Sequence, residues 1–306
     1  MRLVDRYDAI VCDLDGVVYR GDPAVPHAVE ALSAAGIPIQ FATNNASRPP
    51  RQVADHLRRL GLDITDDSVA TSSQAAAWVL TRHLEPGAAV LAIGGEGVAQ
   101  ALRESGFVPV TSIDDRPAAV VQGYGPDVSA TDLAQAAYAV QRGALWLATN
   151  TDHTLPTADG FAPGNGALVL AVGAAVGRGP ELVAGKPDEP LYLMCAERLG
   201  VAPNRVLAIG DRLETDIEGA HQAGMDSLLV LTGVHGVSDA VAAPPQARPT
   251  WMAPDLRALL VEIDELERTS ELLRAEWEIR DHEQVDAGST RVLPPELAAL
   301  SDSLSD

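Results

Sequence analysis

The 306-residue chain has few positive charges and no long apolar run. Its 22 Lys and Arg residues stand against 43 Asp and Glu residues, which gives a net charge of −21 at pH 7. A charge of this sign repels the phosphates of nucleic acids and anionic lipids, so we predict no nucleic-acid partner. No segment reaches the roughly 20 apolar residues of a membrane span, and residues 1–8 lack the apolar stretch of a signal peptide. These absences predict a cytoplasmic protein with no membrane partner.

Cysteines and aromatic residues are also scarce. The two cysteines, Cys12 and Cys195, provide neither a disulfide framework nor the spacing of a zinc site. Aromatic residues make up 4% of the chain, whereas hydrophobic residues as a whole make up 46% and include many Ala, Val and Leu. This composition favours an α/β protein, and the length is enough for two ordinary domains.

Short apolar runs alternate with helical spacings along the chain. Residues 8–13 read as a buried strand, 25–35 as a helix and 37–41 as the next strand, and the alternation returns over 182–231. Such an order is typical of a doubly wound parallel sheet. Strands are also predicted at residues 89–93, 118–121 and 145–149, with helices among them up to residue 176. These elements either extend this sheet or build a second domain.

The carboxyl-terminal part of the chain has a different pattern. From Leu256 to Trp277 apolar residues recur at spacings of three and four, with a polar gap at Ser270. We expect one long amphipathic helix or two shorter ones, which either pack on the protein's own core or form a seam between subunits. Residues 281–306 are polar and acidic, and we predict that they are partly disordered.

Four carboxylates follow predicted strands. Asp13 and Asp15 come at the end of the first strand, and Asp211 and Asp216 follow a later one. The carboxyl ends of strands beside a topological switch point share one crevice, so these side chains can converge. Such a cluster would repel itself unless a cation offset it, and carboxylate oxygens are preferred ligands of Mg²⁺. Each aspartate alone would be read as an ordinary loop residue.

Polar groups suited to phosphate follow two other strands. Thr43 and Asn44 offer a hydroxyl, an amide and backbone N–H groups near the start of a helix, and Lys186 adds a positive charge. None of these residues is decisive alone, because Thr and Asn are common in turns and a loop lysine is usually solvated.

Taken together, these segments resemble the four ordered motifs of the haloacid dehalogenase (HAD) superfamily of phosphohydrolases. Val17 and the string from Thr43 to Arg48 are similar to the NagD and 4-nitrophenylphosphatase branch of that superfamily. The four motif segments are Asp13-Leu-Asp15-Gly16-Val17, Thr43-Asn44-Asn45, Gly185-Lys186-Pro187, and Gly210-Asp211 through Thr215-Asp216.

The resemblance implies an architecture. A Rossmann-like HAD core would be formed by residues 1–75 and 181–266. A large α/β cap that selects the substrate would be inserted between them at residues 76–180. Residues 267–306 would remain as an acidic, helical and partly disordered extension.

The resemblance also implies a phosphatase mechanism. Asp13 would be the nucleophile that forms an aspartyl-phosphate, and Asp15 the general acid and base. Mg²⁺ would be bound by Asp13, by Asp211 and by the backbone carbonyl of Asp15, with Asp216 ordering a metal-bound water. Dehalogenases of the superfamily lack an equivalent of Asp15, so its presence favours phosphoryl transfer.

By the same resemblance, Thr43, Asn44 and Lys186 would hold the transferring phosphoryl oxygens. Transfer to a second sugar hydroxyl, as in mutases, is the alternative within phosphoryl transfer. Mutases of this superfamily typically carry a small helical cap at another position.

Substrate choice is expected to lie in the cap. Tyr124, Asn150, Asp152 and His153 fall in segments that are similar to cap loops of the family, and each either contacts the substrate or shapes its loop. The cap pattern is most similar to bacterial glycerol 3-phosphate phosphatases, so glycerol 3-phosphate is the expected small phosphorylated metabolite. Nucleoside monophosphates, phosphoglycolate and pyridoxal phosphate are alternatives within the branch.

Two expectations concern partners. A homodimer would form through the cap or through the carboxyl-terminal helix. The rival to an enzyme is a non-catalytic scaffold that keeps the fold and binds a partner through that helix, but such a protein is expected to lose Asp13, Asp15 or Lys186, and all three are present.

Overall fold

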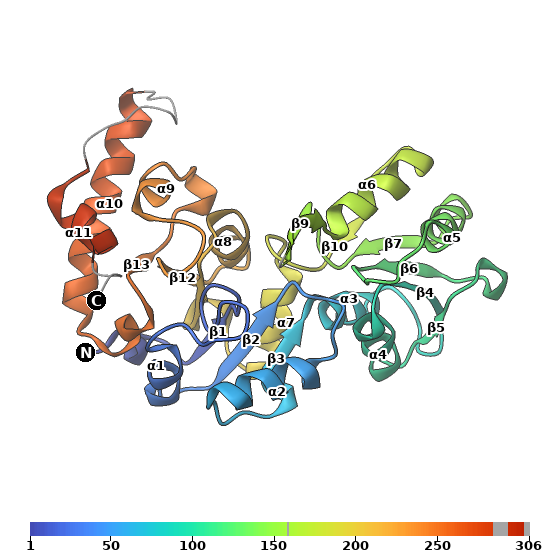
Figure 1. Ribbon diagram of the computed structural model, residues 1–306, viewed down its shortest axis with the longest axis horizontal. Coiled ribbons are helices and arrows are strands. Elements are labelled where there is room, and N and C mark those ends of the chain that lie inside the picture. Colours follow the sequence, from blue (N-terminus) through green and yellow to red (C-terminus); the bar gives the residue numbers. More distant parts are fainter. Residues whose placement is uncertain (158, 284–292, 303–306) are drawn as a thin grey trace. The chain divides into compact units, whose positions relative to one another are not determined.

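The computed structural model describes residues 1–157, 159–283 and 293–302. The chain divides into two compact units (Figure 1). The first unit comprises Met1–Phe41, Leu57–Ile64 and Cys195–Asp306, and the second comprises Ala42–His56 and Thr65–Met194. Three elements contain residues of both units: β2 (Ile39–Thr43), α2 (Pro50–Leu60) and α7 (Pro190–Leu199).

The first unit is built on a parallel sheet with the strand order β13-β12-β11-β1-β2. From β1 the chain passes to β2 on one side and later to β11 on the other, so the topological switch point lies at β1. This order confirms the predicted doubly wound parallel sheet. Besides β2, its strands are β1 (Ala9–Cys12), β11 (Val206–Gly210), β12 (Asp226–Val230) and β13 (Trp251–Ala253).

The central strands of this sheet are apolar throughout, which is typical of parallel strands with both faces covered. Every residue of β1 and of β11 is buried. The sequence did not predict β13. The helices of this unit in the described residues are α1 (Ala28–Ala34), α8 (Glu218–Gln222), α9 (Val237–Val241), α10 (Ile263–Glu283) and α11 (Pro295–Asp302), with short 3₁₀ turns at Leu3–Arg6, Pro203–Arg205, Pro245–Ala247 and Leu256–Leu260 and a π-helical turn at Leu213–Ile217.

The carboxyl-terminal helix packs on its own chain. Leu273 and Trp277 of α10 are buried in the core cluster that also contains α9 and β13 residues. The polar gap at Ser270 has a role, since the Ser270 hydroxyl donates to the carbonyl of Thr250 at 3.0 Å. The helix begins at Ile263, because residues from Leu256 first form a 3₁₀ turn. Residues 284–292 and 303–306 of the predicted disordered tail lie outside the described residues.

The second unit has its own parallel sheet, with the order β10-β7-β6-β4-β5. It is a second sheet and not an extension of the first. Its strands are β4 (Ala89–Ile93), β5 (Val108–Val110), β6 (Ala119–Gln122), β7 (Leu145–Ala148) and β10 (Leu182–Val183). The unit also contains β3 (Val69–Thr71), which belongs to the six-stranded sheet, and the separate antiparallel hairpin of β8 (Thr154–Thr157) and β9 (Gly160–Pro163).

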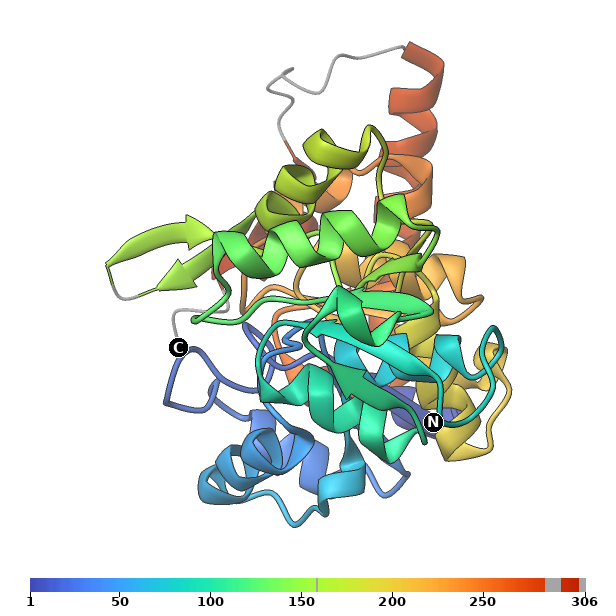
Figure 2. The same ribbon diagram turned by 90° about the vertical axis from the view of Figure 1, so that its right-hand side faces the viewer.

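Helices pair on this second sheet. α5 (Ala130–Gln141) packs beside α6 (Asn165–Val176), and α3 (Ser72–Leu80) packs beside α4 (Glu96–Glu104). The hairpin β8–β9, which the sequence did not predict, extends away from these helices (Figure 2). Among the described residues no helix is both long and apolar enough to cross a membrane. The cap boundaries at 76 and 180 stay a prediction.

Candidate active site

Three aspartates of the first unit converge at the carboxyl end of its sheet. Asp13 follows β1 and Asp211 follows β11, and these two strands are parallel neighbours in which Cys12 is paired with Ile209. Asp13, Asp211 and Asp216 each offer a carboxylate oxygen, and these oxygens lie within 4.8 Å of one another. The structure therefore brings together three of the four carboxylates that the sequence singled out.

Asp216 is positioned by a π-helical turn. The chain does not pass from β11 straight into an α-helix, because Leu213–Ile217 is wound as a π-helix before α8 begins. This turn places the Asp216 side chain beside the end of β11. There its Oδ2 accepts hydrogen bonds from the N–H of Asp211 at 3.2 Å and from the N–H of Arg212 at 3.1 Å.

Asp211 is enclosed by backbone on both sides. Its side chain is 1% exposed, and its Oδ2 accepts a hydrogen bond of 2.7 Å from the N–H of Val234. A Cβ added to Gly16 would lie 2.5 Å from the same oxygen, and a Cβ added to Gly233 would overlap it. Only glycine at these two positions allows the main chain to approach the carboxylate this closely.

Asp13 and Asp15 lie on either side of a buried residue. Leu14 is 1% exposed, whereas Asp13 is half-buried and Asp15 is exposed. The turn that follows is closed by a hydrogen bond of 2.8 Å from the N–H of Gly16 to the carbonyl of Tyr19. The Asp13 carboxylate thus belongs to the cluster, and the Asp15 carboxylate is accessible to solvent or substrate for proton exchange.

The donor set fits Mg²⁺. Three carboxylates this close, two of them almost fully buried, would repel one another strongly without a cation. Their ligand atoms are all oxygens, the ligand type that Mg²⁺ and Ca²⁺ prefer, and no thiolate or imidazole belongs to the group. The Asp15 side chain is not part of this cluster; the prediction for Asp15 concerned its backbone carbonyl, and it stays a prediction.

The phosphate-binding candidates Thr43, Asn44 and Lys186 belong to the second unit. The Asn44 side chain forms hydrogen bonds with both backbone groups of Lys186. Its Oδ1 accepts from the Lys186 N–H at 2.8 Å, and its Nδ2 donates to the Lys186 carbonyl at 2.9 Å. Thr43 Oγ1 accepts from the Asn45 N–H at 3.1 Å. Lys186 is 3% exposed, and its Nζ donates to the carbonyl of Ala42 at 3.4 Å.

These contacts change how Asn44 would act. Its amide group is committed to Lys186, so any contact with phosphate would come from the Asn44 backbone N–H. A buried ammonium beside a loop of backbone N–H groups is suited to an anion. The roles of these three residues remain predictions.

The four cap candidates have unlike surroundings. Asn150 is buried and donates through Nδ2 to the carbonyl of Asn44 at 2.8 Å. Asp152 is half-buried and accepts from Asn44 Nδ2 at 3.3 Å. His153 is exposed, and Tyr124 is half-buried with its carbonyl accepting from the N–H of Gly95 at 3.1 Å. The side chain of Asn150 is thus engaged within the protein, whereas that of His153 is open to solvent.

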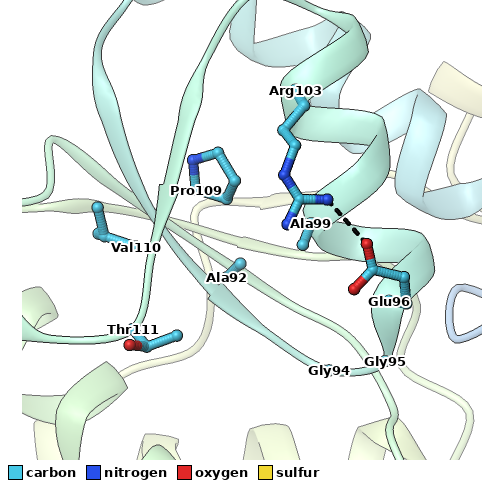
Figure 3. A pocket seen from close by; sticks show the side chains of 9 residues that line it. All are labelled: Ala92, Gly94, Gly95, Glu96, Ala99, Arg103, Pro109, Val110 and Thr111. Atoms are coloured by element: carbon cyan, nitrogen blue, oxygen red, sulfur yellow. Dashed lines mark hydrogen bonds and ion pairs between the residues drawn. The ribbon is translucent and has the colours of Figure 1, made fainter.

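The second unit also contains a pocket of about 270 Å³ that none of the predicted site residues lines (Figure 3). It lies beside α4 and β5. Its one cationic lining residue, Arg103, points to Glu96 and forms an ion pair with it at 2.8 Å. We assign it no role in the chemistry.

Sequence reasoning missed several residues that support the site. The Thr232 hydroxyl donates to the Gly16 carbonyl at 2.7 Å, and the Ser72 hydroxyl donates to the Asn44 carbonyl at 2.7 Å. Asn165, at the start of α6, is buried and bonded to the carbonyl of Asn150 at 2.7 Å. The signal for Thr232 was present, since Thr232-Gly233 follows a predicted strand as the other motifs do.

Comparison with known proteins gives concordant results. The haloacid dehalogenase-like hydrolase model matches residues 10–108, and the HAD-hydrolase-like model matches residues 183–259. D-glycerol 3-phosphate phosphatase from Mycobacterium tuberculosis is 46% identical over 257 residues, which are 84% of this chain and 72% of that protein.

Solved structures agree with the sequence matches. The crystal structure of glycerol phosphate phosphatase from Mycobacterium tuberculosis in complex with magnesium has a TM-score of 0.81 at 46% identity, over 85% of this chain and 78% of that one. The p-nitrophenyl phosphatase from Archaeoglobus fulgidus has a TM-score of 0.77 at 28% identity, over 83% of this chain and 98% of that one.

Proposed function

The chain belongs to the haloacid dehalogenase-like hydrolases, and on that premise we propose that it is a Mg²⁺-dependent phosphomonoesterase that hydrolyses glycerol 3-phosphate. The observation that carries the proposal is the cluster of Asp13, Asp211 and Asp216 at the carboxyl ends of β1 and β11. The identity to a D-glycerol 3-phosphate phosphatase over most of the chain supports the choice of substrate.

Asp13 is the proposed nucleophile. Its carboxylate oxygen attacks phosphorus and forms an acyl phosphate, and the glycerol oxygen leaves. Asp15 donates the proton to that leaving oxygen and then accepts a proton from the water that hydrolyses the acyl phosphate. Its exposure fits a group that exchanges protons with substrate and water.

Asp13 and Asp211 would hold Mg²⁺, which, when bound, neutralises charge on the phosphoryl group and keeps Asp13 ionised. Asp216 keeps the strand end in place through its bonds to the N–H groups of Asp211 and Arg212. Lys186 and the backbone N–H groups of Thr43 and Asn44 are the proposed ligands of the phosphoryl oxygens.

Phosphate release tests the proposal. The substrates are glycerol 3-phosphate, a nucleoside monophosphate, phosphoglycolate, pyridoxal phosphate and 4-nitrophenyl phosphate, each with Mg²⁺ or EDTA, for wild type and Asp13→Asn. We expect Mg²⁺-dependent turnover with the highest kcat/KM for glycerol 3-phosphate, and loss of turnover in Asp13→Asn. If Asp13→Asn is as active as wild type, the assignment of Asp13 as the nucleophile is wrong. If another ester has the highest kcat/KM, that ester replaces glycerol 3-phosphate as the proposed substrate.

A cytoplasmic location and a homodimer remain predictions. Leu273 and Trp277 of α10 are buried within their own chain, so their apolar surface is not available to a second subunit. The cap is therefore the favoured site for a dimer. Light scattering of the purified chain measures the mass directly.

A further inference from the structure

A chain of buried asparagines in the second unit ends on the phosphate-binding candidates. Asn165 Nδ2 donates to the carbonyl of Asn150 at 2.7 Å, and Asn150 Nδ2 donates to the carbonyl of Asn44 at 2.8 Å. The Asn44 amide in turn bonds to both the N–H and the carbonyl of Lys186. Four residues from distant parts of the sequence are thus joined by hydrogen bonds between side chains and backbone.

Each amide in this chain is held in one orientation by its partners. Asn165 Nδ2 lies between two carbonyls, that of Asn150 and that of Gln122 at 3.1 Å, so only a donor fits there. Asn150 donates through Nδ2 and accepts through Oδ1 from the Asp152 N–H at 3.2 Å. An aspartate at either position would place carboxylate oxygen against carbonyl oxygen, although its size is the same.

The residues around this hydrogen-bond network are closely packed. A Cβ on Gly185 would lie 2.5 Å from Asn44 Oδ1, and a Cβ on Gly166 would overlap the carbonyl of Thr151. The start of α6 and the segment before Lys186 therefore lie against the loop that carries Asn150. Asn150 is 4% exposed and Asn165 is 1% exposed, so water cannot easily replace a lost hydrogen bond.

We infer that Asn150 and Asn165 are positioning residues for the phosphate-binding groups, holding the Asn44–Lys186 pair through this network. The inference rests on the proposed function, because it assumes that Asn44 and Lys186 hold the phosphoryl group. It also assigns Asn150, a candidate for substrate contact, to the support of Asn44. The loop predicted to select the substrate and the residues predicted to bind its phosphate then form one hydrogen-bonded assembly.

The test compares Asn150→Asp, Asn150→Ala and Asn165→Asp with wild type in the full-length chain. Each change removes a buried hydrogen-bond donor, so the carbonyl of Asn44 or of Asn150 loses its partner. We expect kcat for glycerol 3-phosphate to fall by about ten- to a hundred-fold at pH 8, and the inhibition constant of inorganic phosphate to rise. Asn204→Asp, an exposed position in the first unit, should stay within about twofold of wild type.

A pH profile separates positioning from a merely structural role. Burial of this position and the facing Asn44 carbonyl oxygen raise the pKa of the carboxyl in Asn150→Asp, so that at low pH it gains a proton and can again donate to that carbonyl. Its kcat relative to wild type should therefore recover between pH 8 and pH 5.5, whereas that of Asn150→Ala should not. Thermal melting is recorded for every variant, and Asn150→Ser takes the place of any that does not fold.

The outcomes are distinct. Folded Asn150→Ala and Asn165→Asp with kcat and phosphate inhibition within twofold of wild type would overturn the inference while leaving the proposed function intact. Absence of turnover by wild type on every ester would instead overturn the proposed function. A loss of kcat in Asn150→Asp that stays the same from pH 8 to pH 5.5 would also contradict the inference.

Discussion

Replacing Gly16 by alanine tests whether Asp211 must stand where the structure places it. Gly16 has a φ of +85°, and its added Cβ would lie 2.5 Å from Asp211 Oδ2. That oxygen accepts from the Val234 N–H at 2.7 Å, so the carboxylate cannot move aside without losing the bond. Gly21 is a matched control, because its φ is +68° and its added Cβ would meet nothing within 4 Å.

The two variants share one cost and differ in another. Alanine in the left-handed region destabilises each by about 1–2 kcal/mol. Gly16→Ala should lose in addition the hydrogen bond to the charged Asp211 carboxylate, which contributes about 1.5–3 kcal/mol. Because Asp211 is a proposed ligand, its displacement should also weaken Mg²⁺ binding by about tenfold or more.

Two measurements follow the effect on Mg²⁺. One is the Mg²⁺ concentration that gives half-maximal phosphate release, and the other is the stabilisation of the protein by Mg²⁺ in thermal unfolding. A ligand at 100 times its Kd stabilises a protein by about 2.7 kcal/mol. Gly21→Ala should keep this stabilisation, whereas a tenfold weaker affinity in Gly16→Ala would leave about 1.4 kcal/mol of it. Equal Mg²⁺ responses in the two variants would refute the placement of Asp211.

Two further predictions concern α10. A chain truncated after Leu266 should keep the oligomeric mass of wild type in size-exclusion chromatography with light scattering. It should unfold at a lower temperature, because the truncation removes Leu273 and Trp277 from the core. A changed mass with an unchanged unfolding temperature would contradict the packing of α10 on its own chain. The hydrogen bond from Arg248 lowers the pKa of Asp281 in the folded state. The pair therefore contributes to the free energy of unfolding above the pKa that Asp281 has in the unfolded chain, and this contribution is lost as pH falls through its folded-state pKa. Urea unfolding at low salt should therefore show a difference between wild type and Asp281→Asn that is larger at pH 7 than at pH 3, and an equal difference at both would refute it.

Local patterns predicted most of the regular elements. The strand at Ala89–Ile93 was predicted with the bounds that the structure has, and most helices were placed within a few residues. Elements with weaker signals were missed: β3, β5 and β13 have three residues each, and the hairpin β8–β9 contains two prolines in its eight strand residues. Short strands are specified by their neighbours in the sheet more than by their own sequence.

The candidate site was predicted unevenly. The cluster of three aspartates followed from carboxylates at strand ends, because parallel strands beside a switch point direct those ends to one edge. The side-chain role of Asn44 could not be predicted, since its partners on Lys186 lie 142 residues away in the chain. Thr232 and Asn165 were missed for the same reason: a hydroxyl or an amide carries no signal for a distant carbonyl.

The sequence by itself determined the fold class, the family and the identity of the acidic residues, because apolar runs and strand-end carboxylates are patterns of a few neighbouring residues. The tertiary structure decided which groups meet. The pairing of β11 with β1 brings Asp211 to Asp13, the π-turn directs Asp216 back to the strand end, and the start of α6 delivers Asn165 to Asn150. These contacts depend on packing between segments far apart in the chain, and no local pattern encodes them.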